Sequence, residues 1–520
     1  MSIEDPALTK LATTWLETCS REHEECMVVD PDYRPTRLIN IVDADHVRLI
    51  ISSKEFSAPY VAFSHCWGKV QTIKLLDGNI DHFKAGLPLE KLPNTYQEAI
   101  RLCLGLGFHH IWIDSLCIIQ DSAEDWEREA KHMKLVYEHS LFNLCSATAS
   151  DSSGRSFIRR RPNLLVPERV VFRDATFELI YDNHFYEDIT FCTLRSRAWV
   201  YQEWYLSKRS LILGSRQLWW HCRQQLACEI RPNGVPMCPR GLWWKEAKGM
   251  KEDKAMPANP NSLCTTWYQR VREYARTKLT RESDRLIAFS GVVQSFGQSH
   301  GFSIADDYLA GLWRAHLPAA LCWTPSSPKK RSATYMAPSW SWASLDGNFI
   351  FKADDDLLQK QCYASFTRAG FAMGDSIEIQ GYVFELKVDY EPHEASQCDL
   401  SVVLDPSLRG QLFWDEQFEG ETVISHLTGP AIQQLAQVRD DQTTRKTMAL
   451  KYADGHFYYL LILDRGHELR FRFTGLVLYQ PLSQPRLHYR VGYWVWEGLP
   501  QGISTDGLSS QCSKETVVIL

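Results

Sequence analysis

Hydrophobic residues in the stretch 58–150 follow two alternating patterns, which are short unbroken apolar runs and longer stretches with helical spacing. The apolar runs predict buried strands at Tyr60–Ser64, Ile111–Ile113 and Phe142–Ala147. The helical spacing predicts one helix over Leu92–Leu106 and another that begins at Ser122. Strands that alternate with helices are typical of a parallel sheet with helices on its faces, so an α/β fold is predicted here.

Both predicted helices carry capping signals at their N-terminal ends. Pro93 precedes Thr95 and Glu98, whose spacing is that of a capping box. The hydroxyl of Ser122 can cap the second helix, and acidic residues fill its first turn. One face of that helix is expected to be apolar and to pack on the sheet: Trp126, Ala130, Met133, Val136 and Tyr137.

The pattern changes along the chain. Residues 195–213 predict a helical piece followed by a strand, and short segments with period-two alternation after Pro338 predict an antiparallel sandwich or barrel. The division predicted from these shifts has an N-terminal helical and extended segment, an α/β domain, a loop and helical region and a β-rich C-terminal region, at 1–45, 46–215, 216–330 and 331–520.

Composition restricts the class of protein. A chain of 520 residues with 44% hydrophobic and 23% charged residues is expected to hold more than one globular domain. With a net charge of −6, the chain has no overall basic character that would indicate nucleic-acid binding. The sequence contains no run of about 18 apolar residues, so no membrane span is predicted. The N-terminus does not have the pattern of a secretion signal, so the 15 cysteines are expected to be reduced thiols in a cytoplasmic protein.

Polar residues follow two of the predicted strands. Ser64 ends the first strand and Asp114 the second, and ligand sites of parallel sheets lie at these carboxyl ends. Asp114 near Trp67 could have a raised pKa and act as an acid or base, or it could fix the following loop by hydrogen bonds. Gln120 and Asp121 are expected to belong to the same polar cluster.

Cysteine and histidine occur together at two places. His65 cannot act on Cys66, because neighbours in a strand point to opposite faces, but a nucleophilic pair of His65 and Cys117 is possible. Near the N-terminus, the spacing of Cys19, His23 and Cys26 fits part of a zinc site, although a structural site needs four ligands. The alternative is a helix that packs these side chains inward.

Three blocks make the chain resemble the fungal heterokaryon-incompatibility (HET) domain family. They are YVAFSHCWG, the stretch from LPNTYQEAI to VYEHS, and SRAWVYQEWYLSKR. The resemblance implies a role in self/non-self recognition and programmed cell death in filamentous fungi. It also implies a distant likeness to TIR domains, which are α/β signalling modules.

Some TIR domains cleave NAD with a helical glutamate in a Trp-Cys-x-x-Glu-like segment, and the comparable stretch here is Trp199 to Glu203, with Val200 in place of cysteine. The resemblance implies that Glu203 could stabilise a ribose cation as a glycosidic bond breaks, with NAD as a possible substrate. Alternatively, Glu203 forms an ion pair with Arg197 or Arg209. Arg197, Trp199 and Gln202 are expected to line any ligand site that Glu203 serves.

Three functions follow from these observations. The first is a signalling protein that acts through self-association or a partner protein. The second is an enzyme that hydrolyses NAD or a related nucleotide through Glu203. The third is a biosynthetic enzyme that acts on a small organic ligand, with Asp114 or His65 as acid–base groups.

Overall fold

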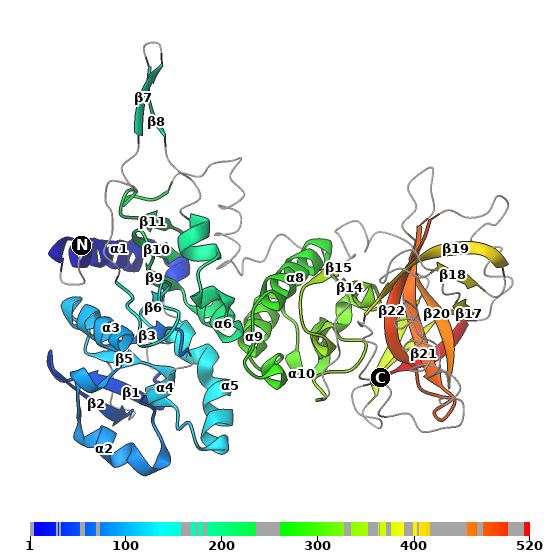
Figure 1. Ribbon diagram of the computed structural model, residues 1–520, viewed down its shortest axis with the longest axis horizontal. Coiled ribbons are helices and arrows are strands. Elements are labelled where there is room, and N and C mark those ends of the chain that lie inside the picture. Colours follow the sequence, from blue (N-terminus) through cyan, green and yellow to red (C-terminus); the bar gives the residue numbers. More distant parts are fainter. Residues whose placement is uncertain are drawn as a thin grey trace, which may run out of the picture. The chain divides into compact units, whose positions relative to one another are not determined.

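The computed structural model describes residues 5–27, 30, 33–52, 58–68, 73–157, 168–172, 175–179, 185–235, 260–326, 334–351, 362, 364–370, 376–388, 399–402, 405–415, 455–464, 472–497 and 514–520. The chain divides into two compact units, which we treat separately (Figure 1). Unit 1 comprises residues 1–254, 277–279 and 287–300, and unit 2 comprises residues 255–276, 280–286 and 301–520. The finer division into four segments stays a prediction.

Unit 1 alternates strands and helices, as its hydrophobic pattern predicts. Its α-helices are α1 (Pro6–Glu22), α2 (Ile80–Ala85), α3 (Asn94–Gly105), α4 (Asp114–Cys117), α5 (Ala123–His139), α6 (Ala198–Leu206) and α9 (Ser290–His300), and the short helix η1 (Glu24–Cys26) follows α1. The strands of its main sheet are β1 (Arg37–Ile41), β2 (His46–Ile51), β3 (Val61–Ser64), β4 (Leu87–Pro88), β5 (His110–Trp112), β6 (Asn143–Ser146), β9 (Arg209–Leu213), β10 (Leu218–Cys222) and β11 (Leu226–Cys228). A separate hairpin joins β7 (Glu168–Phe172) and β8 (Ala175–Leu179).

The main sheet of unit 1 has a parallel centre with antiparallel strands on both sides. Its order is β11-β10-β9-β6-β3-β5-β1-β2-β4, and the pairs β5–β3, β3–β6 and β6–β9 are parallel. The predicted α/β class is therefore confirmed. The outer strands are antiparallel because short connections join β1 to β2 and β10 to β11, and a short turn can only join strands of opposite direction.

Helices cover both faces of this sheet, with α3 on one side and α5 and α6 on the other (Figure 1). Successive side chains of β3 therefore meet different helices. His65, just after the strand, contacts Tyr96 of α3, whereas Ser64 contacts Glu203 of α6. Because side chains alternate along a strand, the neighbouring residues Ser64 and His65 lie on opposite faces of the sheet.

One of the two predicted helix caps is confirmed and the other is wrong. The hydroxyl of Ser122 accepts the backbone N–H of Asp125 at 3.2 Å and caps α5. The capping box of α3 does not form, because Glu98 accepts the backbone N–H groups of Ser156 and Phe157 instead. Tertiary partners thus replace the local cap that the spacing of Thr95 and Glu98 suggested.

A sharp turn follows β3 and ends the SHCWG segment. Gly68 has a φ of +72°, and a Cβ atom at this position would lie 2.1 Å from the Cβ of Asp151. The segment that contains Asp151 is held close to this turn by Ser152, whose hydroxyl donates to the carbonyl of Trp67 at 2.9 Å. Glycine is required here both by the backbone conformation and by the close approach of another segment.

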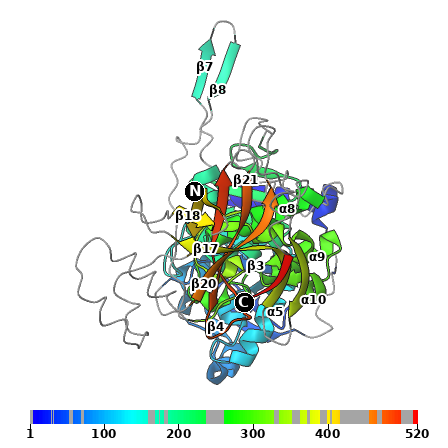
Figure 2. The same cartoon turned by 90° about the vertical axis from the view of Figure 1, so that its right-hand side faces the viewer.

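Unit 2 has a helical part and an antiparallel β part, and Figure 2 shows the β part facing the viewer. Its helices and short strands are α8 (Pro260–Ala275), α10 (Ile304–Asp307), β12 (Tyr308–Leu309), β13 (Leu312–Trp313), β14 (Trp323–Pro325) and β15 (Phe349–Phe351). Its larger sheet contains β16 (Ser365–Gly370), β17 (Ser376–Val388), β18 (Asp399–Val402), β19 (Asp405–Trp414), β20 (Gly455–Asp464), β21 (Arg472–Pro481), β22 (Tyr489–Glu497) and β23 (Lys514–Ile519). All pairings described in this sheet are antiparallel, as the period-two pattern predicts.

Several buried tryptophans contribute to the core of unit 2. Trp340 and Trp342 are 2% and 0% exposed, so this Trp-rich segment belongs to the core. The guanidinium of Arg490 lies over the ring of Trp323 and forms an ion pair with Asp415 at 2.9 Å, and both charged side chains are fully buried. This buried ion pair is compensated by further hydrogen bonds from Arg490 to backbone carbonyls.

Candidate functional site

The centre of the parallel sheet brings together Ser64 at the end of β3 and Glu203 in α6. The hydroxyl of Ser64 donates to Oε2 of Glu203 at 2.5 Å, although the two residues are 139 positions apart. The amide of Asn143, on the neighbouring strand β6, donates to the same hydroxyl at 2.9 Å. Tyr137 of α5 also donates a hydrogen bond to the Glu203 carboxyl. Ser64 of β3 and Tyr137 of α5 therefore bind the Glu203 carboxyl directly, and Asn143 of β6 is linked to it through Ser64.

A second group of hydrogen bonds lies around His65. Its Nε2 atom is 2.8 Å from the hydroxyl of Tyr96, which is 2.8 Å from the hydroxyl of Ser115. The ring of Phe63 stacks on the imidazole, with 5.0 Å between the ring centroids. These contacts fix the orientation of the imidazole on the α3 side of the sheet.

Asp114 lies next to both groups, where β5 ends and α4 begins. Its Oδ1 atom is 3.8 Å from Nε2 of His65, and its Oδ2 atom accepts the indole N–H of Trp67 at 2.8 Å. The guanidinium of Arg197, just before α6, donates to the backbone carbonyl of His65. We call the set of Ser64, His65, Trp67, Tyr96, Asp114, Ser115, Tyr137, Asn143, Arg197 and Glu203 the strand-end network.

Burial shifts the two central titratable groups of the strand-end network in ways that favour their neutral forms. Burial raises the pKa of the Glu203 carboxyl to about 7, even though Arg197 and the hydrogen bonds from Ser64 and Tyr137 act in the opposite direction. Burial likewise lowers the pKa of His65 to about 4, despite the nearby carboxylate of Asp114. Near neutral pH, Glu203 can therefore gain or lose a proton, whereas His65 is uncharged.

The strand-end network is almost entirely enclosed by protein. Ser64, His65 and Glu203 are 1%, 2% and 3% exposed, and their polar atoms are hydrogen-bonded to other side chains. The side chain of Asp114 is 19% exposed and is the carboxylate of the set that reaches solvent. Glu203 has the pKa of an acid–base group, but a substrate could reach it only if covering side chains moved.

The remaining predicted residues have structural contacts of their own. Cys117 is buried, and burial raises the pKa of its thiol to about 12, while His65 pairs with Tyr96. This geometry contradicts the possible His65–Cys117 nucleophilic pair, because the imidazole is directed to α3. The Gln120 side chain donates to the backbone carbonyls of Asp114 and Ile118.

Asp121 is exposed and accepts the backbone N–H of Asp77, so it fixes a surface loop. Gln202 is buried and accepts the backbone N–H of Gly291, which joins α6 to α9. The ring of Trp199 packs edge-on against Trp126 with 6.0 Å between centroids. The described contacts of these three residues lie outside the strand-end network, so their expected ligand-binding role stays a prediction.

The N-terminal cysteines and histidine form a separate cluster. Cys19 lies in the last turns of α1, His23 ends that helix, and Cys26 ends η1. The structure adds Cys222, from the end of β10, as a fourth side chain. We call Cys19, His23, Cys26 and Cys222 the cysteine cluster.

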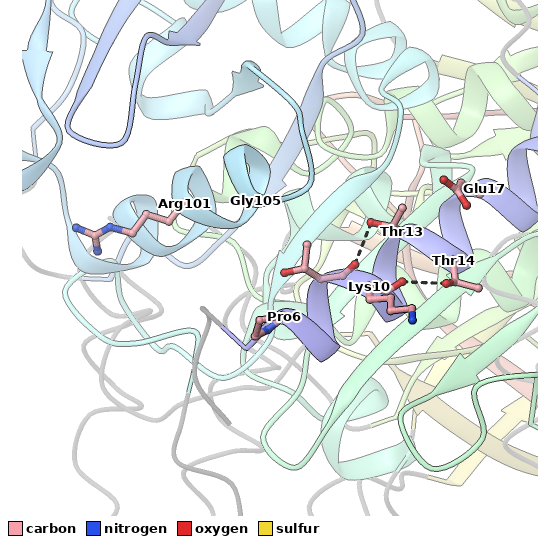
Figure 3. Close-up of a pocket in the computed structure, with 8 residues that line it drawn as sticks. Pro6, Lys10, Thr13, Thr14, Glu17, Arg101 and Gly105 are labelled. Carbon is pink, nitrogen blue, oxygen red and sulfur yellow. Dashed lines mark hydrogen bonds between the residues drawn. The ribbon is translucent and has the colours of Figure 1, made fainter.

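An open pocket elsewhere in unit 1 contains none of the predicted site residues. It is lined by residues of α1 between Pro6 and Glu17 and by Arg101 and Gly105 of α3, and Figure 3 shows Lys10 and Glu17 among the lining side chains. The hydroxyls of Thr13 and Thr14 donate to backbone carbonyls within α1. These side chains do not form a cluster that could carry out acid–base chemistry.

Several members of these sites were missed from sequence alone. Tyr137 was predicted to face the sheet, but only as an apolar residue. Asn143 is a polar residue in a strand predicted to be buried, and such a residue needs a partner, so it could have been singled out. For Tyr96 and Cys222 the sequence carries no comparable signal, because their partners lie 31 and 199 residues away.

Comparison with known proteins gives one match. Residues 60–203 match the family model described as Heterokaryon incompatibility protein (HET). Searches of curated proteins and of solved structures found no significant match. Among the helices that the structure describes, none combines the length and apolar character that a membrane crossing requires. The matched segment begins one residue before β3 and ends at Glu203 of α6, so the similarity to this family covers the parallel centre of the unit 1 sheet up to α6.

Proposed function

We propose that this protein acts in heterokaryon incompatibility, as a signalling protein of self/non-self recognition that promotes programmed cell death in a filamentous fungus. The family match over residues 60–203 carries this proposal. The enclosed state of the strand-end network supports signalling over catalysis, because Ser64, His65 and Glu203 are 1–3% exposed. Their polar groups are used in bonds within the network, from Ser64 to Glu203 and between His65 and Tyr96. In this proposal the network holds the HET domain in one conformation, and the signal passes to a second copy or to a partner protein.

The test is inducible expression of the full chain in a filamentous fungus, with growth and cell viability scored. Wild type should arrest growth. Gly68→Ala should relieve the arrest, because a Cβ atom there would lie 2.1 Å from the Cβ of Asp151. Gly107→Ala is the matched control, since Gly107 also has a positive φ (+84°) but no atom within 4 Å of its added Cβ. Normal growth with wild type at verified expression would refute the proposal.

A second candidate is hydrolysis of NAD through Glu203, and one observation favours it. The pKa of the Glu203 carboxyl is raised to about 7 by burial, and Ser64 holds its Oε2 atom at 2.5 Å. A carboxylate so placed can stabilise the positive charge that develops on ribose when the nicotinamide bond breaks. The required access to a residue that is 3% exposed speaks against it.

Nicotinamide release separates the two candidates. Glu203→Gln keeps the size of the side chain and one acceptor oxygen but removes the carboxylate. If the protein is an NAD hydrolase, the variant loses release and growth arrest together. If it signals without catalysis, wild type releases no nicotinamide above blank and Glu203→Gln still arrests growth. Glu98→Gln is the control, because Glu98 is another carboxyl whose pKa burial raises and it lies outside the network.

A further inference from the structure

The cysteine cluster assembles four metal-binding side chains from two distant parts of the chain. Cys19, His23 and Cys26 come from the end of α1 and from η1, and Cys222 comes from the end of β10, against which α1 packs (Figure 1). Their ligand atoms all lie within 4.8 Å of one another. Three cysteines and one histidine are a common ligand set of structural zinc sites.

The distances agree with tetrahedral coordination. Zinc–sulfur bonds of about 2.3 Å and zinc–nitrogen bonds of about 2.0 Å would separate a sulfur from a nitrogen by about 3.5 Å, and two sulfurs by about 3.8 Å. Sγ of Cys222 lies 3.3 Å from Nδ1 of His23. The cluster therefore has nearly the size that one zinc ion needs, before any adjustment to a metal.

The surroundings suit deprotonated sulfur ligands. Cys19 and Cys26 are 0% exposed and Cys222 is 3% exposed, so charged thiolates here would need a cation beside them. The guanidinium of Arg209 donates to Sγ of Cys19 at 3.2 Å, and the backbone N–H of Gln225 donates to Sγ of Cys222 at 3.2 Å. Three thiolates and a neutral imidazole around a divalent ion leave one negative charge, which Arg209 balances.

The turn after β10 fixes the position of the Cys222 sulfur by two hydrogen bonds with Gln225. The backbone N–H of Cys222 donates to the carbonyl of Gln225, while the N–H of Gln225 points back to the sulfur. A disulfide would use only two of the three cysteines and would leave the imidazole of His23 without a role. All four positions are protein side chains, which is typical of a closed structural site and not of a catalytic one.

We propose that Cys19, His23, Cys26 and Cys222 bind one structural zinc ion that fastens α1 and η1 to the end of β10. The ion joins positions that are about 200 residues apart and ties the segment before the HET domain to the hairpin after it. The predicted three-ligand spacing near the N-terminus thereby becomes a complete site.

The test is the zinc content of the full chain, purified without metal-affinity steps and measured by plasma mass spectrometry. Wild type should contain about one zinc per chain, and Cys222→Ser should lose most of it. Cys228→Ala should keep its zinc, because Cys228 lies on the other strand of the same hairpin and belongs to an apolar cluster.

A second measurement does not depend on how the variants fold. Wild type reloaded with cobalt(II) should show the visible absorption bands of a tetrahedral cobalt ion with thiolate ligands. Folded wild type that holds no zinc and takes up no cobalt would overturn the proposal. So would mass spectrometry that finds two of the three cysteines joined as a disulfide in freshly purified protein.

Discussion

The strand-end network and the cysteine cluster are both buried polar groups in unit 1, but they differ in how their bonding is completed. In the strand-end network, Ser64 and Tyr137 donate hydrogen bonds to the carboxyl of Glu203, and the amide of Asn143 donates to the hydroxyl of Ser64. In the cysteine cluster, four ligand atoms face a common centre within 4.8 Å of one another. Protein groups alone satisfy the hydrogen bonds of the strand-end network, whereas the proposed zinc ion would complete the cysteine cluster.

The largest effect is expected from metal removal. A structural zinc site contributes free energy directly to folding, so chelation of the full chain should lower the thermal midpoint of unit 1 by about 10 °C or more. The measurement is thermal unfolding with hydrogen exchange of peptides from α1 and β10. Zinc added back after chelation is the control and should restore the midpoint. An unchanged thermal midpoint after verified metal loss would mean that the cysteine cluster, like the strand-end network, does not depend on a metal ion for its stability.

Removal of the central carboxyl from the strand-end network should have the next largest effect. Glu203→Ala removes the carboxyl that accepts from the buried hydroxyls of Ser64 and Tyr137 and opens a cavity, which should lower the free energy of unfolding by about 3 kcal/mol. Ser64 would keep the amide oxygen of Asn143, at 3.1 Å, as its acceptor. Glu203→Gln keeps an acceptor and should cost about 1 kcal/mol or less. The measurement is hydrogen exchange of amides in β3 and β6.

The control for Glu203 is an exposed glutamate of the same unit. Glu127 forms an exposed ion pair with Lys131 on α5, so Glu127→Ala should leave the stability of unit 1 nearly unchanged. Equal effects of Ala and Gln at position 203 would mean that the hydrogen bonds contribute little.

The comparison also shows which features could be predicted from sequence. The strands around Tyr60–Ser64 and Phe142–Ala147 were predictable because a buried parallel strand needs an unbroken apolar run. The cap at Ser122 was predictable because its partner is three residues away. Such features depend on neighbours in the sequence.

Features that depend on distant partners could not be predicted in the same way. The Thr95–Glu98 capping box was wrong because Glu98 bonds to backbone groups 58 and 59 residues further on. His65 was given Cys117 as a possible partner, but the fold offers Tyr96. Cys222 could not be assigned to the cysteine cluster, because the sequence does not show where β10 ends relative to α1.

The pH dependence of stability should come next in size. The unfolded Glu203 carboxyl loses its proton near pH 4.5, whereas the folded one holds it to about pH 7 because of burial. The unfolded state therefore binds fewer protons in this window, and stability should fall by about 2 kcal/mol as the pH rises from 5 to about 7.5.

Glu203→Gln should remove this loss, and chemical denaturation at several pH values would measure it. His65 affects stability in the opposite sense, because burial lowers its pKa to about 4. Its contribution to the free energy of unfolding is lost as the pH falls from 6.5 to below 4. A variant with the same pH profile as wild type above pH 5 would contradict the raised pKa of Glu203.

The smallest effect is expected at the edge of the strand-end network. Tyr96→Phe removes the hydroxyl that lies 2.8 Å from both His65 and Ser115, and it should lower the free energy of unfolding by about 1 kcal/mol. Tyr33→Phe is the control in the same unit, because Tyr33 contacts His139 through its ring. Hydrogen exchange of α3 and β3 peptides would measure both. A small loss would fit a network whose stability is divided among many bonds, in contrast to a cluster held by one ion. A loss as large as that of Glu203→Ala would instead mean that the two faces of the sheet form one cooperative unit around β3.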